Sequence, residues 1–148
     1  MGATVPTQQR ALCFYLNTSI LIRALEDAEA GELLRECCSR HWCIISGIHW
    51  LENWRRETRE AVTRLLEELG VDVAEFFNHV VSRINRRARL LIRNHGWSPR
   101  RTLDLMHVLA ALRLDCDGII AVDRFIARRA KEYGLLYVNQ YTGCPENG

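Results

Sequence analysis

Apolar and polar residues follow two different periods along this chain, which predicts strands separated by helices. Short apolar runs bounded by polar residues or glycine are typical of buried strands. The runs expected to be strands are 12–16, 43–46, 71–73, 118–122 and 135–138. Since segments with a helical period separate these runs, the pattern predicts the α/β class, a three-layer α/β/α sandwich with a central parallel sheet.

Apolar residues that recur every three or four positions predict the helices between the strands. The segments expected to be helical are 20–28, 32–40, 50–69, 76–95, 102–112 and 124–133. Gly31 is expected to separate the first two helices, and Gly70, Gly96 and Gly134 are expected to end three of the others. The period at the third helix begins with Trp50 and Trp54.

Length and composition predict one globular domain spanning 1–148. The chain has 148 residues and is 48% hydrophobic, which is enough for one core. We expect that core at about 12–139, with flexible tails at 1–10 and 140–148. The longest uncharged apolar stretch is far below the ~20 residues that span a bilayer, so we expect a cytoplasmic protein with no membrane partner.

The six cysteines form no CxxC pair. Cys37, His41 and Cys43 lie close in sequence, but structural zinc normally takes four ligands from two such clusters, which disfavours zinc. We therefore expect buried free thiols, with internal disulfides as the alternative in a hyperthermophile.

Basic residues are distributed unevenly. The window 76–103 contains no Asp or Glu but seven arginines: Arg83, Arg86, Arg87, Arg89, Arg93, Arg100 and Arg101. Arginine makes bidentate contacts to phosphate, so five of these are expected to bind RNA: Arg86, Arg87, Arg93, Arg100 and Arg101. The alternative is a solvated or salt-bridged helix face.

Four polar residues fall where predicted strands end or helices begin: Asn17, Glu52, Asp104 and Asp123. Single acids at such places are usually explained by the helix dipole. Acids that converge without a basic partner indicate a Mg²⁺ or Mn²⁺ site. His107 shares a helical face with Asp104, and we interpret it as a core residue rather than a catalytic base.

Four segments in this order resemble the signature blocks of PIN-domain nucleases of the VapC type. The segments are 15–21 (YLNTSIL), 45–52 (ISGIHWLE), 103–112 (LDLMHVLAAL) and 121–124 (AVDR). Together they span about 12–139. The resemblance implies a PIN-like fold and a Mg²⁺- or Mn²⁺-dependent endoribonuclease, similar to a toxin that cleaves structured RNA.

The resemblance also implies roles for particular residues. Glu52, Asp104 and Asp123 would bind or orient the metal, Asp117 would be a less certain accessory, and Ser19 would steady a ligand by hydrogen bonding. Asn17 stands where the family normally has a metal-binding aspartate. An amide at this position is expected to weaken or abolish cleavage.

The same resemblance implies a cognate antitoxin and a homodimer, for which Trp50 and Trp54 are candidate surface residues. Two alternatives stay open. One is a PIN nuclease of RNA maturation without an antitoxin. The other is a degenerate PIN domain that binds RNA or protein without cutting.

Overall fold

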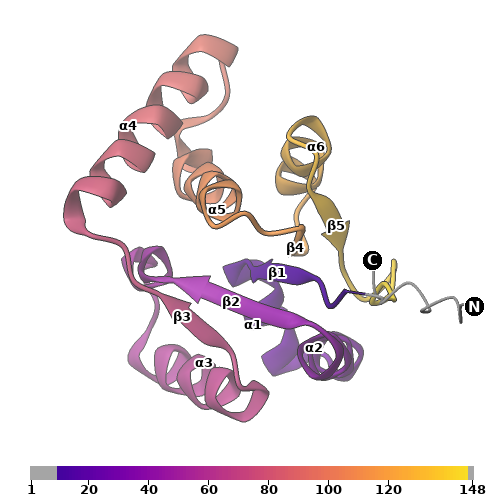
Figure 1. Cartoon of the computed structure of the whole chain (residues 1–148). Helices are drawn as coiled ribbons and strands as arrows, with labels where there is room; N and C mark the ends of the chain where they lie inside the picture. Colours follow the sequence, from indigo (N-terminus) through magenta and orange to yellow (C-terminus); the bar gives the residue numbers. More distant parts are fainter. Residues whose placement is uncertain (1–9, 147–148) are drawn as a thin grey trace, which may run out of the picture.

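The computed structural model describes residues 10–146 and contains a parallel five-stranded sheet between two layers of helices (Figure 1). The strands are β1 (Cys13–Leu16), β2 (Trp42–Ser46), β3 (Asp72–Ala74), β4 (Gly118–Ile120) and β5 (Leu136–Val138). They lie in the order β3-β2-β1-β4-β5, with every neighbouring pair parallel. The predicted three-layer α/β/α sandwich is confirmed.

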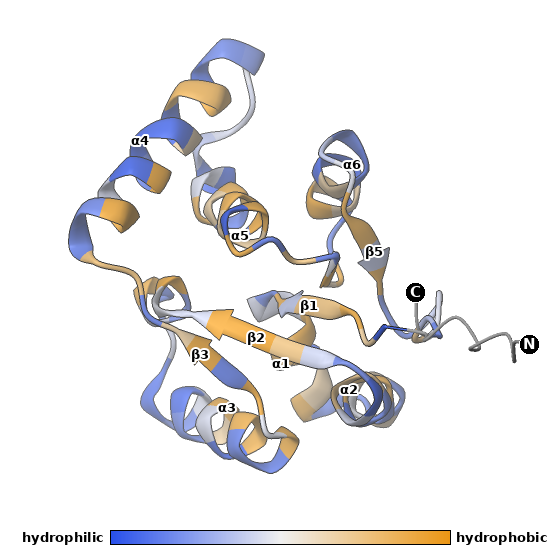
Figure 2. Cartoon of the chain, viewed as in Figure 1, coloured by the Kyte–Doolittle hydropathy of each residue, from blue (hydrophilic) through white to orange (hydrophobic). Residues whose placement is uncertain are grey.

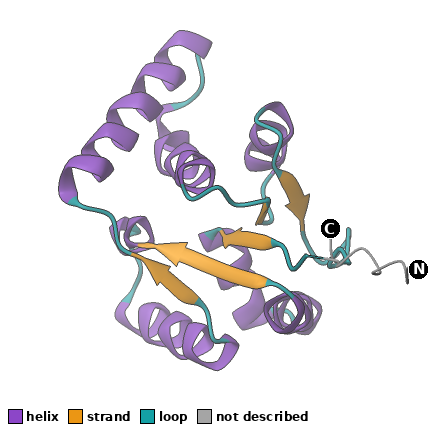
Figure 3. Cartoon of the chain, viewed as in Figure 1, coloured by secondary structure: helices purple, strands orange, loops and turns teal. Residues whose placement is uncertain are grey.

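Helices cover both faces of this sheet (Figure 3). The α-helices are α1 (Thr18–Glu26), α2 (Ala28–Arg40), α3 (Arg56–Leu69), α4 (Asn78–His95), α5 (Thr102–Arg113) and α6 (Arg124–Glu132), with 3-10 turns η1 (Gly47–Leu51) and η2 (Pro99–Arg101). One layer contains α1, α2 and α3, and the other contains α5 and α6, while α4 packs on α5 (Figure 1). Within 10–146, no helix combines the length and the apolar character needed to cross a membrane.

Two separate cores result from the alternation of side chains along each strand. Phe14 and Leu16 of β1 face the layer of α1 and α2, whereas Tyr15 between them faces the layer of α5. Successive side chains of a strand point to opposite faces, so a fully buried strand contributes to both cores. In Figure 2 the strands are accordingly mostly apolar, and the helices carry polar residues on their outer sides.

The first two helices are separated at Asp27 rather than at Gly31. The Asp27 side chain accepts a hydrogen bond from the backbone N–H of Glu29 and caps α2, as Asp commonly does at a helix start. Gly31 is buried inside α2, after the start of that helix. The predicted break at Gly31 was therefore wrong.

Trp50 and Trp54 lie outside α3, although their spacing predicted that they begin it. Ser46 and His49 form a capping box that starts η1, and α3 begins only at Arg56. The two indole rings meet edge to face with centroids 6.3 Å apart. A four-residue spacing of large aromatics reflects packing between a turn and a loop here, not a helical stripe.

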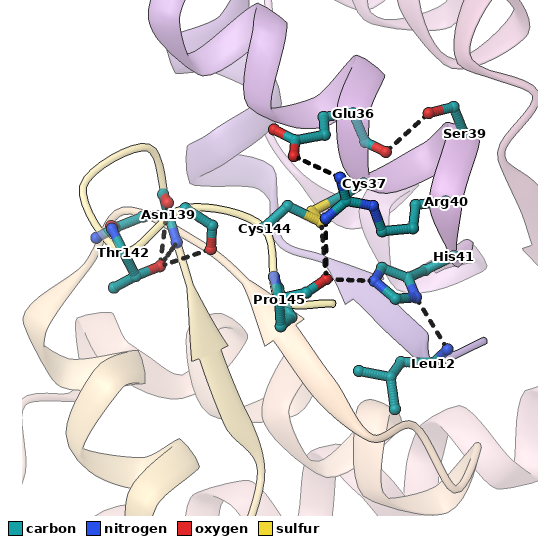
Figure 4. Close-up of a disulfide and its surroundings, with 11 residues drawn as sticks. Leu12, Glu36, Cys37, Ser39, Arg40, His41, Asn139, Thr142, Cys144 and Pro145 are labelled. Atoms are coloured by element: carbon teal, nitrogen blue, oxygen red, sulfur yellow. Dashed lines mark hydrogen bonds and ion pairs between the residues drawn. A yellow bond between two sulfur atoms is a disulfide. The ribbon is translucent and has the colours of Figure 1, made fainter. Parts of the chain in front are cut away.

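The segment after β5, where we expected a flexible tail, folds back against α2 (Figure 4). Cys144 forms a disulfide with Cys37, 107 residues earlier, so the expectation of free thiols was wrong for this pair. His41 donates from Nε2 to the carbonyl oxygen of Pro145 at 2.6 Å and accepts from the N–H of Leu12 at 3.0 Å. These contacts also occupy two members of the weak zinc candidate, Cys37 and His41.

Candidate functional site

The carboxyl edge of the sheet collects the polar residues singled out in the sequence. Asn17 directly follows β1, Asp123 lies three residues after the end of β4, and Glu52 directly follows η1, the turn after β2. Asp104 lies in the first turn of α5. The chain passes from β1 to one side of the sheet and returns to β4 on the other, which makes this the switch point of strand order, where open α/β sheets bind ligands.

Asn17 is fully buried and caps α1. Its side-chain Oδ1 accepts a hydrogen bond from the backbone N–H of Ser19 at 2.9 Å, and its own N–H donates to Ile120 O at 2.9 Å. The side-chain Nδ2 has no hydrogen-bond partner in the part of the chain that the structure describes. An aspartate here would make the same cap and carry a second oxygen where the amide carries an unpaired donor.

Ser19 forms a hydrogen bond with Asn17, in keeping with its expected role. Its backbone N–H, not its hydroxyl, bonds Asn17, and its Oγ accepts from the N–H of Val122 at 2.9 Å. The hydroxyl therefore ties α1 to the loop after β4. Ser19 helps to hold Asn17 and the segment before Asp123 together.

Glu52 is held by two donors. Its Oε1 accepts from the Thr18 hydroxyl at 3.1 Å and from His107 Nε2 at 3.3 Å. Burial raises the pKa of Glu52, and the Thr18 hydrogen bond partly opposes that rise. A partly buried carboxyl with a raised pKa and two fixed donors is typical of a functional site.

A relay of buried hydrogen bonds links Glu52, through His107, to Tyr15 and Ser46. Tyr15 OH lies 2.7 Å from His107 Nδ1 and 2.8 Å from Ser46 Oγ. Burial lowers the pKa of His107 to about 3, so the ring is neutral near pH 7. A neutral ring that donates from Nε2 to Glu52 must accept at Nδ1, and the Tyr15 hydroxyl is the donor there.

Sequence reasoning placed His107 in the core and assigned no role to His49. His107 is buried as expected, but it is also hydrogen-bonded to Glu52. His49 packs beside it, with ring centroids 4.5 Å apart, and burial lowers its pKa to about 3. The sequence signal for this cluster was the position of Tyr15, His49 and His107 within apolar segments. Buried polar groups need hydrogen-bond partners, so these three side chains could have been expected to contact one another or a nearby polar group.

Arg101 joins the other two acids. Its Nη1 lies 2.9 Å from Asp123 Oδ2 and 3.2 Å from Asp104 Oδ2. Burial raises the pKa of Asp104, the Arg101 hydrogen bond lowers it, and the charges of Asp123 and Glu52 raise it further. Asp104 is therefore repelled by the charges of Asp123 and Glu52, and Arg101 compensates part of that repulsion.

The acids were predicted to lack a basic partner, and Arg101 shows that this expectation was wrong. The predicted contact of Arg101 with RNA stays a prediction. The i,i+3 spacing to Asp104 and the fold that brings Asp123 alongside explain the pairing. Within 10–146, no three His, Cys, Asp or Glu side chains lie close enough to hold a metal ion. With the Asn17 amide donor also buried here, the arrangement fits Mg²⁺ or Mn²⁺ poorly in this state, because hard cations need oxygen ligands.

Asp117 lies at the opposite edge of the sheet, before β4 rather than after it. It accepts from the backbone N–H of Cys13 and from Arg10, each at 2.8 Å. These two donors lower its pKa despite the opposing effect of burial. Asp117 is thus a structural residue of the amino edge and not an accessory of the acids.

Five arginines on α4 are exposed and form no salt bridge with the described residues: Arg83, Arg86, Arg87, Arg89 and Arg93. A groove of about 700 Å³ between the end of α4 and η2 is lined by Arg89, Arg93, Trp97 and Thr102, among others. Arg100, next to it in η2, is also exposed. The basic surface formed by the α4 arginines and Arg100 thus extends to η2. Arg101, the last residue of η2, pairs with Asp104 and Asp123.

Neither a search against protein-family models nor a search of the curated proteins finds a match to this chain.

Proposed function

We propose that this chain is a PIN-type endoribonuclease of the VapC kind, acting on structured RNA with Mg²⁺ or Mn²⁺ and weakened by Asn17. One observation carries the proposal: Asn17, Glu52, Asp104 and Asp123 gather at the carboxyl edge of the sheet, at the switch point of strand order. This is the place where open α/β sheets bind ligands. The four segments that resemble the PIN family supply the reaction class.

A divalent cation, if bound, would supply activation of water and neutralisation of charge on the phosphate. Glu52, Asp104 and Asp123 are the residues that would hold it. Binding would require Arg101 to release Asp104 and Asp123, with which it now pairs, and the one side-chain oxygen of Asn17 already caps α1. The relay through His107 and Tyr15 keeps the Glu52 carboxyl oriented.

A second candidate is a degenerate PIN domain that binds RNA or protein without cutting. Two observations favour it. Arg101 already occupies the two acids with a positive charge, and the buried Nδ2 of Asn17 is a donor where a cation requires an acceptor. A third possibility is a PIN nuclease of RNA maturation, which a neighbouring gene for a small antitoxin-like protein would argue against.

Replacement of Asn17 by aspartate tests the nuclease proposal. Purified wild-type chain, Asn17→Asp and the double variant Asn17→Asp/Asp104→Asn are compared on a mixed structured RNA with Mn²⁺ or Mg²⁺. We expect weak or no cleavage by the wild type, at least tenfold faster cleavage by Asn17→Asp, and loss of that gain in the double variant. Absence of cleavage by Asn17→Asp, with Mn²⁺ bound, would support the binding-module candidate instead.

Salt dependence tests whether α4 contacts RNA. Each phosphate neutralised releases counterions, so replacement of Arg86, Arg87 and Arg93 by alanine should reduce the slope of log K against log salt by up to about 2 for single-stranded contacts. The matched control replaces Arg55, Arg56 and Arg64, which removes the same charge. These arginines lie at the start of α3 and within it, where acidic residues alternate with the basic ones. Equal effects of both triple variants would show that only net charge matters.

The cognate antitoxin and the homodimer rest on the family resemblance. Trp50 and Trp54 are partly buried against the core, whereas Trp42 and Phe77 expose 58% and 75% of their surface. Sedimentation at micromolar concentration tests the dimer. A monomer in that range would contradict it.

A further inference from the structure

Two free cysteines from distant parts of the chain face each other at the amino edge of the sheet. Cys13 begins β1, and Cys116 lies two residues before β4, its hydrogen-bonded neighbour. Their sulfur atoms are 3.6 Å apart across a sequence separation of 103 residues. Both side chains lie on the face covered by α5 and α6, where Cys116 is buried and Cys13 is partly exposed.

The backbone around this pair is held on both sides. Asp117 donates its N–H to the carbonyl oxygen of Cys13 at 2.8 Å, and its carboxylate accepts the N–H of Cys13 at 2.8 Å. A disulfide requires sulfur atoms about 2.05 Å apart. The Cys13 thiol already donates a hydrogen bond to the Cys116 sulfur, so the two sulfur atoms need to approach by about 1.5 Å for the bond to form.

We propose that Cys13 and Cys116 are a second disulfide site of this chain. The bond would tie β1 to the segment before β4 on the face opposite to the Cys37–Cys144 disulfide, which lies on the side of α2 (Figure 4). The two cross-links would then hold the amino edge from both faces. This inference does not depend on the proposed nuclease function.

The bond forms by thiol–disulfide exchange with a small-molecule disulfide such as oxidised glutathione. The thiolate of Cys13, the more exposed of the two, attacks one sulfur of the oxidant and releases one glutathione thiolate, which takes up the proton that Cys13 lost. The thiolate of Cys116 then attacks the Cys13 sulfur of the mixed disulfide and releases the second glutathione. Two protein thiols are oxidised, and one glutathione disulfide is reduced to two thiols.

The test uses the full chain, incubated with oxidised glutathione or with a phosphine reductant, then alkylated in acid and mapped by peptide mass spectrometry. We expect the peptides of Cys13 and Cys116 to be cross-linked after oxidation and both alkylated after reduction. In Cys116→Ser, Cys13 should stop at the glutathione mixed disulfide. The matched control Cys38→Ser should form the Cys13–Cys116 bond as the wild type does.

Thermal unfolding provides a second measurement. Closure of so long a loop should raise the Tm of the oxidised wild type by roughly 5 to 10 °C over oxidised Cys13→Ser. If oxidised wild type carries alkylated or glutathione-bound Cys13 together with free Cys116, or if Cys13 is bonded to another cysteine, the proposal is wrong. Should Cys116→Ser fail to fold, the reciprocal variant Cys13→Ser must leave Cys116 unmodified, since its buried thiol then has no partner.

Discussion

The two edges of the parallel sheet shift the pKa values of their ionisable side chains in opposite senses, against the charged form at one edge and toward it at the other. At the carboxyl edge, burial raises the pKa of Glu52 and of Asp104 and lowers the pKa of His107 to about 3, so each charged form is disfavoured. At the amino edge, the N–H of Cys13 and the guanidinium of Arg10 lower the pKa of Asp117, so its charged form is favoured.

This difference separates a region whose electrostatics are typical of binding and catalytic sites from a region that stabilises the fold. Groups held in an unfavourable charge state are typical of binding and catalytic sites, where the rest of the structure compensates. The amino edge supplies such compensation through the Cys37–Cys144 disulfide and the contacts of His41 with Leu12 and Pro145. A ligand at the carboxyl edge would then act on a scaffold fixed at its other end.

The largest effect is expected at the amino edge, from Gly118→Ala. A Cβ atom at Gly118 would lie 2.7 Å from a ring carbon of Phe14 and 2.8 Å from the carbonyl oxygen of Leu136. Both neighbouring strands would have to move, which should cost about 3 kcal/mol of unfolding free energy. Urea denaturation measures it. Gly47→Ala at the carboxyl edge is the control, since a Cβ there meets nothing within 4 Å, and an equal loss in both variants would contradict the close-packing account.

A smaller loss is expected at the carboxyl edge from Tyr15→Phe. The change removes the hydroxyl that lies between Ser46 and His107 and leaves their buried polar atoms without that partner. The cost should be about 2 kcal/mol in urea denaturation. Tyr141→Phe, at an exposed side chain, should change stability by less than about 0.5 kcal/mol. If Tyr15→Phe is equally neutral, the relay contributes nothing to the fold.

The pH dependence of stability should weaken in His107→Gln, which keeps a side-chain N–H donor. The folded pKa of His107, about 3, lies below its ordinary value of 6.5, so its unfolded form binds the proton more tightly. Its contribution is complete above pH 6.5 and is lost as pH falls toward 3, at about 1.4 kcal/mol per pH unit. Urea denaturation from pH 7 to 5 should show a slope smaller by this amount in the variant.

The pKa of His49 is also lowered to about 3, so His49 should still contribute to the pH dependence of the unfolding free energy in His107→Gln. The raised pKa values of Glu52 and Asp104 act in the opposite direction at lower pH, since their protonation favours the folded state. An identical slope in wild type and His107→Gln would mean that His107 can be protonated in the folded chain.

The smallest effect is expected from Arg10→Ala at the amino edge. Arg10 pairs with Asp117 at 2.8 Å, but 70% of its side chain is exposed. Its removal should cost about 0.5 kcal/mol and less at high salt, because water and ions screen the pair. The bond from the Cys13 N–H to Asp117 remains, so a loss above about 1.5 kcal/mol in urea denaturation would show that Arg10 has a larger role.

The sequence predicted the parallel sheet because strand and helix periods are local properties. A run such as 118–122 is apolar at every position and therefore indicates a strand buried on both faces. The sequence also indicated that Asn17, Glu52, Asp104 and Asp123 gather at one edge of the sheet. Parallel strands end at the same edge, and helices that follow them begin there. Errors arose where local signals compete, as at Asp27 and Gly31.

Only the tertiary structure decided which side chains pair across the fold. Arg101 with Asp123, His107 with Glu52 and Cys37 with Cys144 are separated by 22, 55 and 107 residues. No periodicity extends over such intervals, because these partners are set by strand order and by the depth at which each side chain is buried. The sequence by itself therefore determined the elements and the edge at which the polar groups gather, whereas three-dimensional packing determined whether those groups meet a metal, an arginine or one another.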